Sequence, residues 1–419
     1  MNVFLIIILT TVIGIYFLNI VVNILNVRHI NAEIPDEFKG YYDAKKYFIS
    51  QEYLKDNTKL EIITQSIVTP IIIILILKGG FNMADRFVRS LHLGLVPTGL
   101  IFVGIFMAAY QLLMIPFSVY RNFVIEEKYG FNRTTKKIFT MDILKTFLLI
   151  AGIGGIILSA VLWFFDTIGS TAWIYCWGSV TLFQIFLVLI APVVIMPLFN
   201  KFTPLDEGGL KAAIENYVKL QGFKINGIFK MDGSRRTTKT NAFFTGLGKY
   251  RRIVLFDTLI KKHTIEELVS ILAHEIGHYK KMHLLKSGII SIAMNGLMFY
   301  LLSMLINNTG LFEAFRMEKT STYAGLIFFG FLYRPIDMLF TVFRNIISRR
   351  HEYIADIYSI KSYGKPQAMI EALKKLSVEN LSNLTPHPLK VFLEYSHPPV
   401  LDRIRAIQEI YSHKKEATD

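Results

Sequence analysis

The chain has 419 residues, of which 52% are hydrophobic and 19% charged, with a net charge of +14 and one cysteine, Cys176. A soluble globular chain rarely has so apolar a composition, so membrane spans are expected first. One cysteine excludes an intrachain disulfide framework and a cysteine-based metal site. The positive charge does not indicate nucleic acid, because the basic residues lie in the connections between apolar segments rather than in one patch interleaved with aromatic residues.

Seven stretches are long and apolar enough to cross a bilayer as helices, which takes about 20 residues. They are residues 3–25, 62–78, 93–116, 146–165, 172–197, 288–306 and 322–347. The first lacks the basic start and the small-residue cleavage site of a signal peptide, so we expect a retained span. The expected fold class is mainly α, a polytopic membrane protein with seven transmembrane helices.

The lysines and arginines between the spans indicate the orientation of the chain. Seven spans place the N-terminus, 79–92, 166–171 and 307–321 on one side, which holds few basic residues. The other side holds 26–61, 117–145, 198–287 and everything after 348. Its first loop alone carries Arg28, Lys39, Lys45, Lys46, Lys55 and Lys59. The positive-inside rule places this second side in the cytoplasm.

Residues 198–287 form a long soluble stretch in which short elements are expected. Leu210, Ile214 and Val218 recur every four residues ahead of Gly222, which predicts an amphipathic helix that ends there. Two strand-like runs follow, and a Gly-Leu-Gly turn between them predicts a hairpin. The runs are 241–244 and 253–256, and the turn is Gly246-Leu247-Gly248.

A helix with candidate metal ligands follows the hairpin. Thr264 precedes Glu267 by three residues, the spacing of a capping box. We expect this helix to run through 274–278, which reads His-Glu-Ile-Gly-His, and to continue into the sixth span. The chain then divides into helices one to five (1–197), a cytoplasmic catalytic region (198–287), helices six and seven (288–347) and C-terminal catalytic helices (348–419).

His274 and His278 are four residues apart, so both imidazoles project from one face of a helix and can share one cation. Glu275 lies beside them and can accept a proton from a metal-bound water, whose pKa zinc lowers towards neutrality. Short motifs of this kind also occur by chance, but this one lies in a capped helix with a candidate third ligand downstream. The pattern predicts a catalytic site with one Zn²⁺ per chain.

The third ligand is expected from the helix that leaves the seventh span on the same side of the membrane. Glu352 and Asp356 share a helical face, so Glu352 can complete the ligand set and leave the fourth position for water. Asp356 can then orient a ligand histidine, or it can belong to an ordinary solvated helix. His351 points about 100° away from Glu352. His283 lies five residues beyond His278, off the metal face, which favours a structural role.

These landmarks resemble the Ste24-type CAAX prenyl protease family, the seven-span branch of the M48 metallopeptidases. Its motifs are matched in order along nearly the whole chain. They are Tyr129-Gly130-Phe131-Asn132, Pro197 to Phe202, Asn241-Ala242 ahead of Ile253 to Asp257, the His-Glu-x-x-His element, Glu352 to Asp356, and Ser396-His397-Pro398-Pro399 before Asp402-Arg403. The resemblance implies that the seven helices form a chambered barrel, closed at its cytoplasmic end by a small α+β zinc-peptidase domain.

The resemblance implies roles at the metal for five residues. The zinc ligands would be His274, His278 and Glu352. Glu275 would be the catalytic base, and Asp356 would be the supporting acid, which is sometimes described as a proton donor. The chain is therefore predicted to be a zinc metalloendopeptidase.

The resemblance also implies contacts with substrate. His397 and Arg403 match positions that stabilise the oxyanion and hold the substrate backbone. Asn241 and Ala242 match an edge strand that binds extended peptide, since an unpaired strand edge offers main-chain hydrogen bonds to any sequence. The alternatives are a packed turn histidine for His397 and a simple turn residue for Asn241.

The predicted function is peptide-bond hydrolysis at a membrane-embedded zinc centre, of the type that removes C-terminal tripeptides from prenylated CAAX proteins. A quality-control protease of the HtpX type, with broader substrates, is the first alternative. A transporter or channel is the second, because Arg334 and Asp337 lie within the seventh span. These two residues are three apart on one helical face, so they could form a buried pair or contact substrate.

The expected partners are a peptide or protein substrate, prenylated if the CAAX assignment holds, and membrane lipid. No nucleic acid is expected, and the protein is predicted to be a monomer. It should be an integral multi-pass protein of a bacterial inner membrane or an endoplasmic-reticulum-type membrane, with its active site on the cytoplasmic side.

Overall fold

The computed structural model describes residues 2–246 and 251–416, with the side chains of the last helix described as far as Ser412. Within these residues, seven helices are long and apolar enough to cross a membrane, which confirms the seven expected spans. They are Val3–Arg28, Ala44–Leu77, Leu95–Glu126, Lys136–Thr167, Gly169–Phe199, His283–Leu305 and Thr322–Tyr363. The Leu247-Gly248 part of the expected hairpin turn lies outside the described residues.

Several spans extend well beyond their apolar cores. Their helices are α1 (Val3–Arg28), α2 (Ala44–Leu77), α4 (Leu95–Tyr120), α5 (Lys136–Leu149), α6 (Gly155–Thr167), α7 (Ala172–Ile190), α12 (His283–Leu305) and α14 (Thr322–Tyr363). A π-helical turn at Ile150–Gly154 joins α5 to α6, and similar turns extend α4 and α7. Pro70 lies inside α2, so the short second span is one half of a 34-residue helix.

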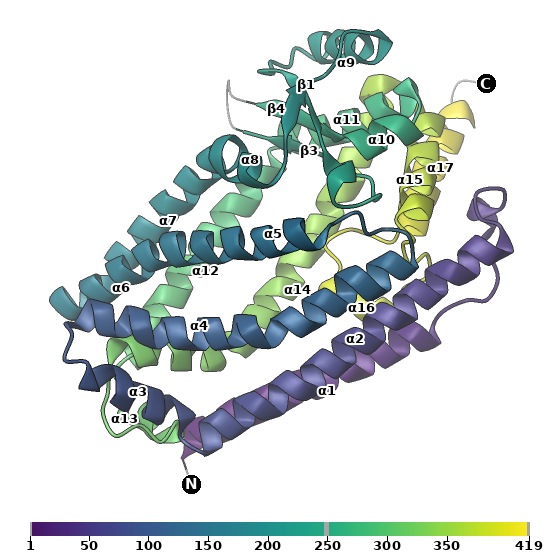
Figure 1. The fold of residues 1–419 in the computed structure, drawn as a ribbon. Helices are drawn as coiled ribbons and strands as arrows, with labels where there is room; N and C mark the ends of the chain where they lie inside the picture. Colours follow the sequence, from purple (N-terminus) through teal and green to yellow (C-terminus); the bar gives the residue numbers. More distant parts are fainter. Residues whose placement is uncertain (1, 247–250, 417–419) are drawn as a thin grey trace.

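The connections assigned to the less basic side meet at one end of the molecule. Helices α3 (Gly80–Ser90) and α13 (Thr309–Ala314) lie beside the N-terminus there, as Figure 1 shows. Phe81 of α3 packs edge-on against Phe315, with ring centroids 5.3 Å apart. The Asn2 side-chain amide donates a hydrogen bond to the Gly310 carbonyl at 2.7 Å. This grouping agrees with the predicted alternation of sides.

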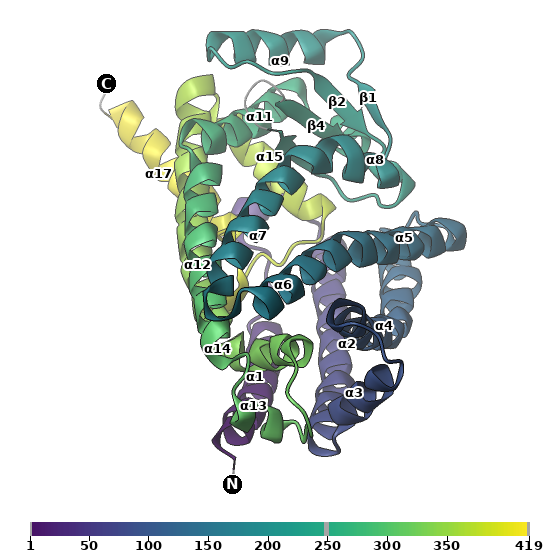
Figure 2. The same cartoon turned by 90° about the vertical axis from the view of Figure 1, so that its left-hand side faces the viewer.

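A small mixed sheet lies at the opposite end (Figure 2). Its strands are β1 (Phe202–Pro204), β2 (Ile228–Met231), β3 (Ala242–Thr245) and β4 (Arg252–Phe256), in the order β1-β2-β4-β3. The predicted hairpin is confirmed, with Ala242 opposite Leu255 in an antiparallel pair. Strand β2 runs parallel to β4, and neither β1 nor β2 was expected. Because β3 is last in the order, one of its edges pairs with no other strand among the described residues.

Three helices cover this sheet. They are α9 (Gly209–Leu220), α10 (Asp257–Lys262) and α11 (Ile265–Lys280). The expected amphipathic helix is α9, whose Ile214 and Val218 are buried, and Gly222 follows it with a φ of +59°. Ile214, Leu255 and Leu272 belong to one apolar core that also includes Ala372. The C-terminal helices therefore pack into the same unit as the sheet.

The predicted continuity of α11 with the sixth span is wrong. Helix α11 ends at Lys280, and α12 begins at His283. Met282 between them adopts a left-handed φ of +57°, a conformation that costs a non-glycine residue energy and cannot continue a right-handed helix. The tertiary packing of the two helices imposes this break, since Met282 itself gives no helix-stop signal.

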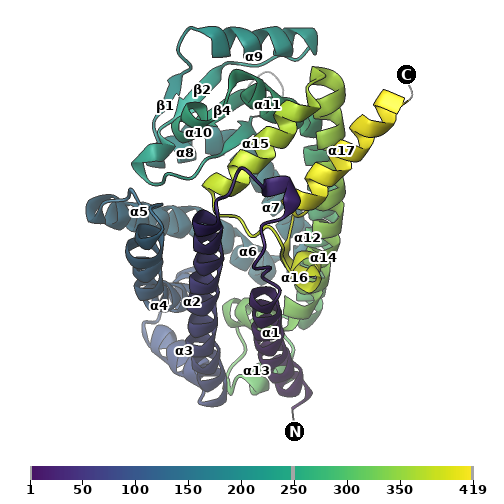
Figure 3. The ribbon, with the colours of Figure 1, turned by 90° about the vertical axis from the view of Figure 1, so that its right-hand side faces the viewer.

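The C-terminal segment returns to the sheet end. Helix α14 runs without interruption for 42 residues, out of the membrane and past Glu352. Helices α15 (Pro366–Glu379), α16 (Pro388–Glu394) and α17 (Val400–Glu416) follow it. Figure 3 shows α15 and α17 beside the upper part of α14. Ile404 and Ile407 of α17 are buried, so this helix packs its apolar face into the core.

Two cavities flank α14 within the membrane part. One of about 560 Å³ is bounded by α1, α2, α4 and α14, and Tyr16, Gln65 and Arg334 contribute polar groups to it. The other, of about 660 Å³, has an apolar lining from α4, α6, α12 and α14. Asp337 pairs with Arg344, at 3.6 Å, rather than with Arg334. The predicted alternative of a buried Arg334–Asp337 pair is therefore wrong. Arg334 instead lies at a cavity wall of the chambered barrel.

Candidate metal centre

Helix α11 carries two of the expected ligands and starts with the predicted capping box. The Thr264 hydroxyl accepts a hydrogen bond from the Glu267 N–H at 3.3 Å, and the Glu267 carboxylate accepts one from the Thr264 N–H at 3.2 Å. The same carboxylate accepts a hydrogen bond from Lys375 of α15 at 2.7 Å. The start of α11 is fixed locally and by a neighbouring helix, which sets the position of His274 about three turns later.

Helices α11 and α14 approach closely at Gly277. A Cβ atom on this glycine would lie 3.1 Å from the Tyr358 Cβ and 3.2 Å from the Ala355 backbone. These separations are shorter than a favourable contact between carbon atoms. The missing side chain therefore lets α14 bring Glu352 and Asp356 against the histidine face of α11.

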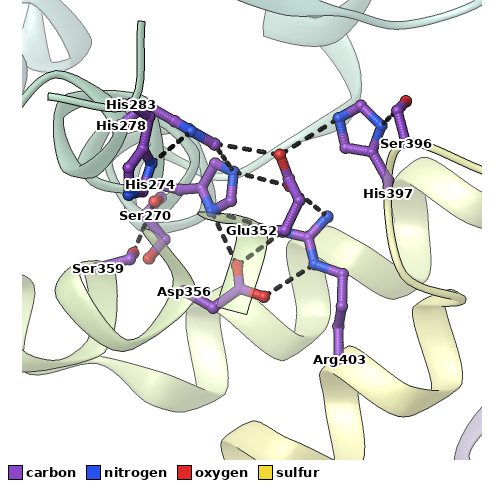
Figure 4. Close-up of polar contacts among 10 residues, drawn as sticks. All are labelled: Ser270, His274, His278, His283, Glu352, Asp356, Ser359, Ser396, His397 and Arg403. Atoms are coloured by element: carbon purple, nitrogen blue, oxygen red, sulfur yellow. Dashed lines mark hydrogen bonds and ion pairs between the residues drawn. The ribbon is translucent and has the colours of Figure 1, made fainter. Parts of the chain in front are cut away.

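The three expected ligands meet at this contact (Figure 4). The Nε2 atoms of His274 and His278 lie 3.1 Å apart. Glu352 faces both, with Oε2 at 3.3 Å from the His274 Nε2 and Oε1 at 3.2 Å from the His278 Nε2. One ligand atom from each residue lies within 4.8 Å of the other two. Residues 78 positions apart in the chain thus form one cluster.

The cluster has the properties of a cation site. The Glu352 Oε2 is buried and makes no hydrogen bond among the described residues, with the His274 Nε2 at 3.3 Å and the Arg403 Nη1 at 3.5 Å within ion-pair distance only. Such an atom is costly unless something satisfies its lone pairs. Two imidazole nitrogens and one carboxylate are also the donor set of many catalytic zinc centres. The residues present therefore fit a divalent metal ion.

Asp356 supports His274 from behind the cluster. Its Oδ1 accepts a hydrogen bond from the His274 Nδ1 at 2.8 Å, which leaves the Nε2 lone pair facing Glu352. Arg403 donates to the same carboxylate twice, from Nε at 2.8 Å and from Nη2 at 2.6 Å. Asp356 is 2% exposed, so the alternative of a solvated helix face is wrong for this residue.

The charges around His274 determine its protonation. Burial disfavours its imidazolium, but the carboxylates of Asp356 and Glu352 outweigh this and raise the pKa of His274 to about 9. Burial also opposes the charge of Arg403, and Asp356 again dominates, so the pKa of Arg403 is raised and the guanidinium stays charged. Without a metal ion, a proton occupies the place of the cation on His274.

Two further candidates line the open side of the cluster. Burial raises the pKa of Glu275 above its ordinary value, against the opposing charges of His274 and His278. The His397 Nε2 lies 3.4 Å from the Glu352 Oε1, on the side opposite the two ligand histidines. Its side chain is 64% exposed. The alternative of a packed turn histidine is therefore wrong, and the ring is free to meet a ligand.

A small pocket opens beside the cluster and reaches the free edge of the sheet. Its volume is about 120 Å³. Polar groups from Asn241, Glu275, His397 and Arg403 stand on one part of its wall. The candidate ligands His274 and Glu352 also line it, and the apolar part of the wall consists of Ala242, Leu259, Ile271, Met369, Ala372, Leu373 and Leu376. The structure thus brings the predicted substrate residues next to the predicted ligands.

The Tyr129 to Asn132 motif holds the segment that leads into β3. The Phe131 carbonyl accepts a hydrogen bond from the Thr238 N–H at 3.1 Å. Lys239 forms an ion pair with Glu126 at 2.9 Å and lies over the ring of Phe131. These contacts connect the end of the third span to the chain just before Asn241, which fixes the free edge relative to the metal cluster.

One neighbour of the cluster was not expected. The His283 Nδ1 lies 3.1 Å from the His278 Nδ1, and the His283 ring stacks on His351 with centroids 3.9 Å apart. The reasoning that placed His283 off the metal face assumed an unbroken helix. The break at Met282 makes this contact possible, and no residue type in the sequence predicts it.

Comparisons with known proteins show which proteins the chain is similar to. Residues 23–201 match a family model described as the CAAX prenyl protease N-terminal region with five membrane helices. Residues 204–411 match the model of peptidase family M48. The chain is 36% identical over 344 residues to CAAX prenyl protease 1 of Saccharomyces cerevisiae, covering 78% of this chain and 76% of that protein. The human CAAX prenyl protease 1 homolog is 34% identical over 338 residues, 71% of each chain.

A solved structure extends the similarity to the whole fold. The crystal structure of S. mikatae Ste24p superposes with a TM-score of 0.92 at 31% sequence identity. The match covers 96% of this chain and 99% of that one. The seven helices and the small sheet are therefore arranged as in that protein.

Proposed function

The chain belongs to the M48 metallopeptidases, in the CAAX prenyl protease branch, and from this premise we propose that it cleaves peptide bonds with one zinc ion held by His274, His278 and Glu352. The family implies a metal. The convergence of the three ligand atoms, with the Glu352 Oε2 buried and without a hydrogen bond among the described residues, is the observation that supports this ligand set.

In this proposal the protein groups divide the work around the scissile bond. Zinc supplies Lewis-acid chemistry, which polarises the carbonyl and acidifies water. Glu275 accepts the proton of the attacking water at its carboxylate and returns it to the departing amine. The exposed His397 donates from Nε2 to the developing oxyanion. Arg403 acts mainly through Asp356, which accepts hydrogen bonds from its Nε and Nη2. Its Nη1 lies 3.5 Å from the Glu352 Oε2, so any contact with substrate is made beside that carboxylate.

The substrate is expected to bind as an added strand. The free edge of β3 at Asn241 and Ala242 can form main-chain hydrogen bonds with an extended peptide beside the metal. The adjoining apolar pocket of about 120 Å³ has room for one aliphatic side chain. This chemistry suits the aliphatic positions of a CAAX sequence, so we propose that C-terminal peptides of prenylated proteins are the substrates, as the names of the relatives indicate.

The catalytic unit is proposed to combine 198–287 with 348–419, because both contribute to one core and one ligand set. A single chain supplies every group named, which fits a monomer. We place the active site in the cytoplasm because the positively charged connections lie at the same end as the sheet.

Metal analysis and one variant test the zinc proposal. The purified protein should contain one zinc per chain, and Glu275→Gln should keep that zinc while losing about 10²- to 10⁴-fold in activity. Glu409→Gln, the same change at an exposed carboxylate of α17, is the control for general damage. A protein without zinc, or full activity of Glu275→Gln, would overturn the proposal.

The substrate class needs a separate assay. A farnesylated CAAX peptide should be cleaved much faster than the same peptide without the lipid. Equal rates would favour the alternative of a broader quality-control protease, which the same pocket and strand edge could serve.

A further inference from the structure

The turn between α11 and α12 brings a second histidine against a proposed zinc ligand. In an unbroken helix, residues five apart point about 140° away from each other and are separated by about 7.5 Å along the axis. The left-handed Met282 breaks the helix at this point. His283 therefore returns as the first residue of α12, with its Nδ1 3.1 Å from the His278 Nδ1.

The contact assigns the protons on both rings. The His278 Nε2 faces Glu352 and His274, so a metal there needs the lone pair of that nitrogen. The neutral ring must then carry its proton on Nδ1 and donate it to the His283 Nδ1. His283 in turn must accept at Nδ1 and carry its own proton on Nε2. A cationic His283 would place two donors face to face, so the arrangement requires a neutral ring.

The surroundings hold His283 in this orientation. It is 4% exposed, and its Nε2 has no hydrogen-bond partner among the described residues. Its ring lies parallel to that of His351, with an interplanar angle of 6°. His351 precedes the ligand Glu352 on α14. Packing, rather than a second hydrogen bond, therefore fixes the plane of the acceptor.

We propose that His283 is a positioning residue of the metal centre, which fixes the tautomer and ring plane of His278 as Asp356 does for His274. This inference rests on the proposed zinc function. The two ligand histidines then have different supports, a carboxylate for His274 and a neutral imidazole for His278. A neutral acceptor, unlike a carboxylate, adds no negative charge to a site that already holds the carboxylates of Asp356, Glu352 and Glu275.

Zinc affinity of the full-length protein in detergent tests the proposal, by competition with a chromogenic chelator. His283→Phe keeps the stack on His351 and removes the acceptor, so zinc should bind about 10- to 100-fold more weakly. His283→Asn places an amide oxygen where the Nδ1 lone pair was, and its affinity should lie within about threefold of wild type. His351→Phe keeps both stack and acceptor, and it should bind zinc as wild type does.

The outcomes separate this inference from the zinc function itself. If the wild-type protein binds no zinc, the proposed zinc function as a whole is overturned. Tight wild-type binding with unchanged affinity in His283→Phe would overturn the role of His283 alone. If His283→Phe does not fold, His283→Asn decides: retained affinity supports the acceptor, and a loss as large as tenfold overturns it.

Discussion

At the residue scale, the centre depends on charges that are buried together. Asp356 is almost completely buried between His274 and Arg403, whose side chain is 11% exposed. Each of these groups would be costly to bury alone, and each is satisfied by the others. The arginine at the C-terminal signature is therefore part of the metal support as much as it is a candidate for substrate binding.

Breaking the Asp356–Arg403 ion pair should weaken both the fold and the metal site. Asp356→Asn leaves Arg403 buried without a full counter-charge, which is expected to cost about 3–5 kcal/mol of stability and about 10- to 100-fold in zinc affinity. Thermal melting and chelator competition measure the two effects. Asp206→Asn is the matched control, because its pair with Lys230 lies at the exposed surface of the sheet unit and should contribute little. Equal effects of the two variants would contradict this account.

Metal binding should also depend on pH through His274. Its raised pKa of about 9 means that, below this pH, the metal-free ring holds a proton that zinc must displace. Displacing one proton makes the apparent zinc affinity rise about tenfold per pH unit up to the pKa and level off above it. Affinities measured from pH 7 to pH 10 would show this slope. A flat profile over that range would contradict the raised pKa.

At the element scale, the close approach of α11 and α14 positions the ligands. Only Gly277 allows it, since a Cβ there would meet the Ala355 backbone at 3.2 Å. Backbone cannot move aside as the end of a flexible side chain can. The distance between His274 and Glu352 therefore depends on one missing methyl group.

Gly277→Ala should separate these helices. Overpacking of this kind costs about 1–3 kcal/mol, and the displaced Glu352 should weaken zinc binding, both measurable by melting with and without zinc. Gly288→Ala in α12 is the control, because nothing lies within 4 Å of its added Cβ. That variant should be neutral or slightly stabilising, since alanine favours helix. Normal zinc affinity in Gly277→Ala would contradict the proposed function of this contact.

At the scale of the whole molecule, the connections divide between two ends. The N-terminus, α3 and α13 gather at one end, and the sheet with the metal cluster lies at the other (Figure 1). The proposed orientation places the cluster end in the cytoplasm, because the basic connections lie there. Substrate cleavage would then take place on the side where newly made proteins are present.

Cysteine labelling in intact membranes tests this orientation. Cys176 is buried, so the background should be low. A cysteine at the exposed Lys281, beside the cluster, should react only with membrane-permeant reagent or after the membrane is opened. One at the exposed Lys319, at the opposite end, should react with impermeant reagent from outside. The reverse labelling pattern would show the opposite orientation in the membrane and would contradict the cytoplasmic location of the active site.

The sequence by itself determined the seven spans and the capped helix, and it predicted the candidate ligands that the structure brings together. A long apolar segment in lipid has to satisfy its backbone internally, so it is helical wherever it packs. The spacing of His274 and His278 fixes their common face for the same local reason. The β3–β4 hairpin could also be predicted from the sequence, because its two strands are close together in the chain.

Only the tertiary structure decided the rest, because the remaining contacts join distant segments. The parallel pairing of β2 with β4, the bidentate contact of Arg403 with Asp356 and the pairing of Asp337 with Arg344 depend on how helices and strands meet. The break at Met282 depends on packing that overrides a good helical sequence. It moved His283 from the wrong face of a predicted helix to within hydrogen-bond distance of His278.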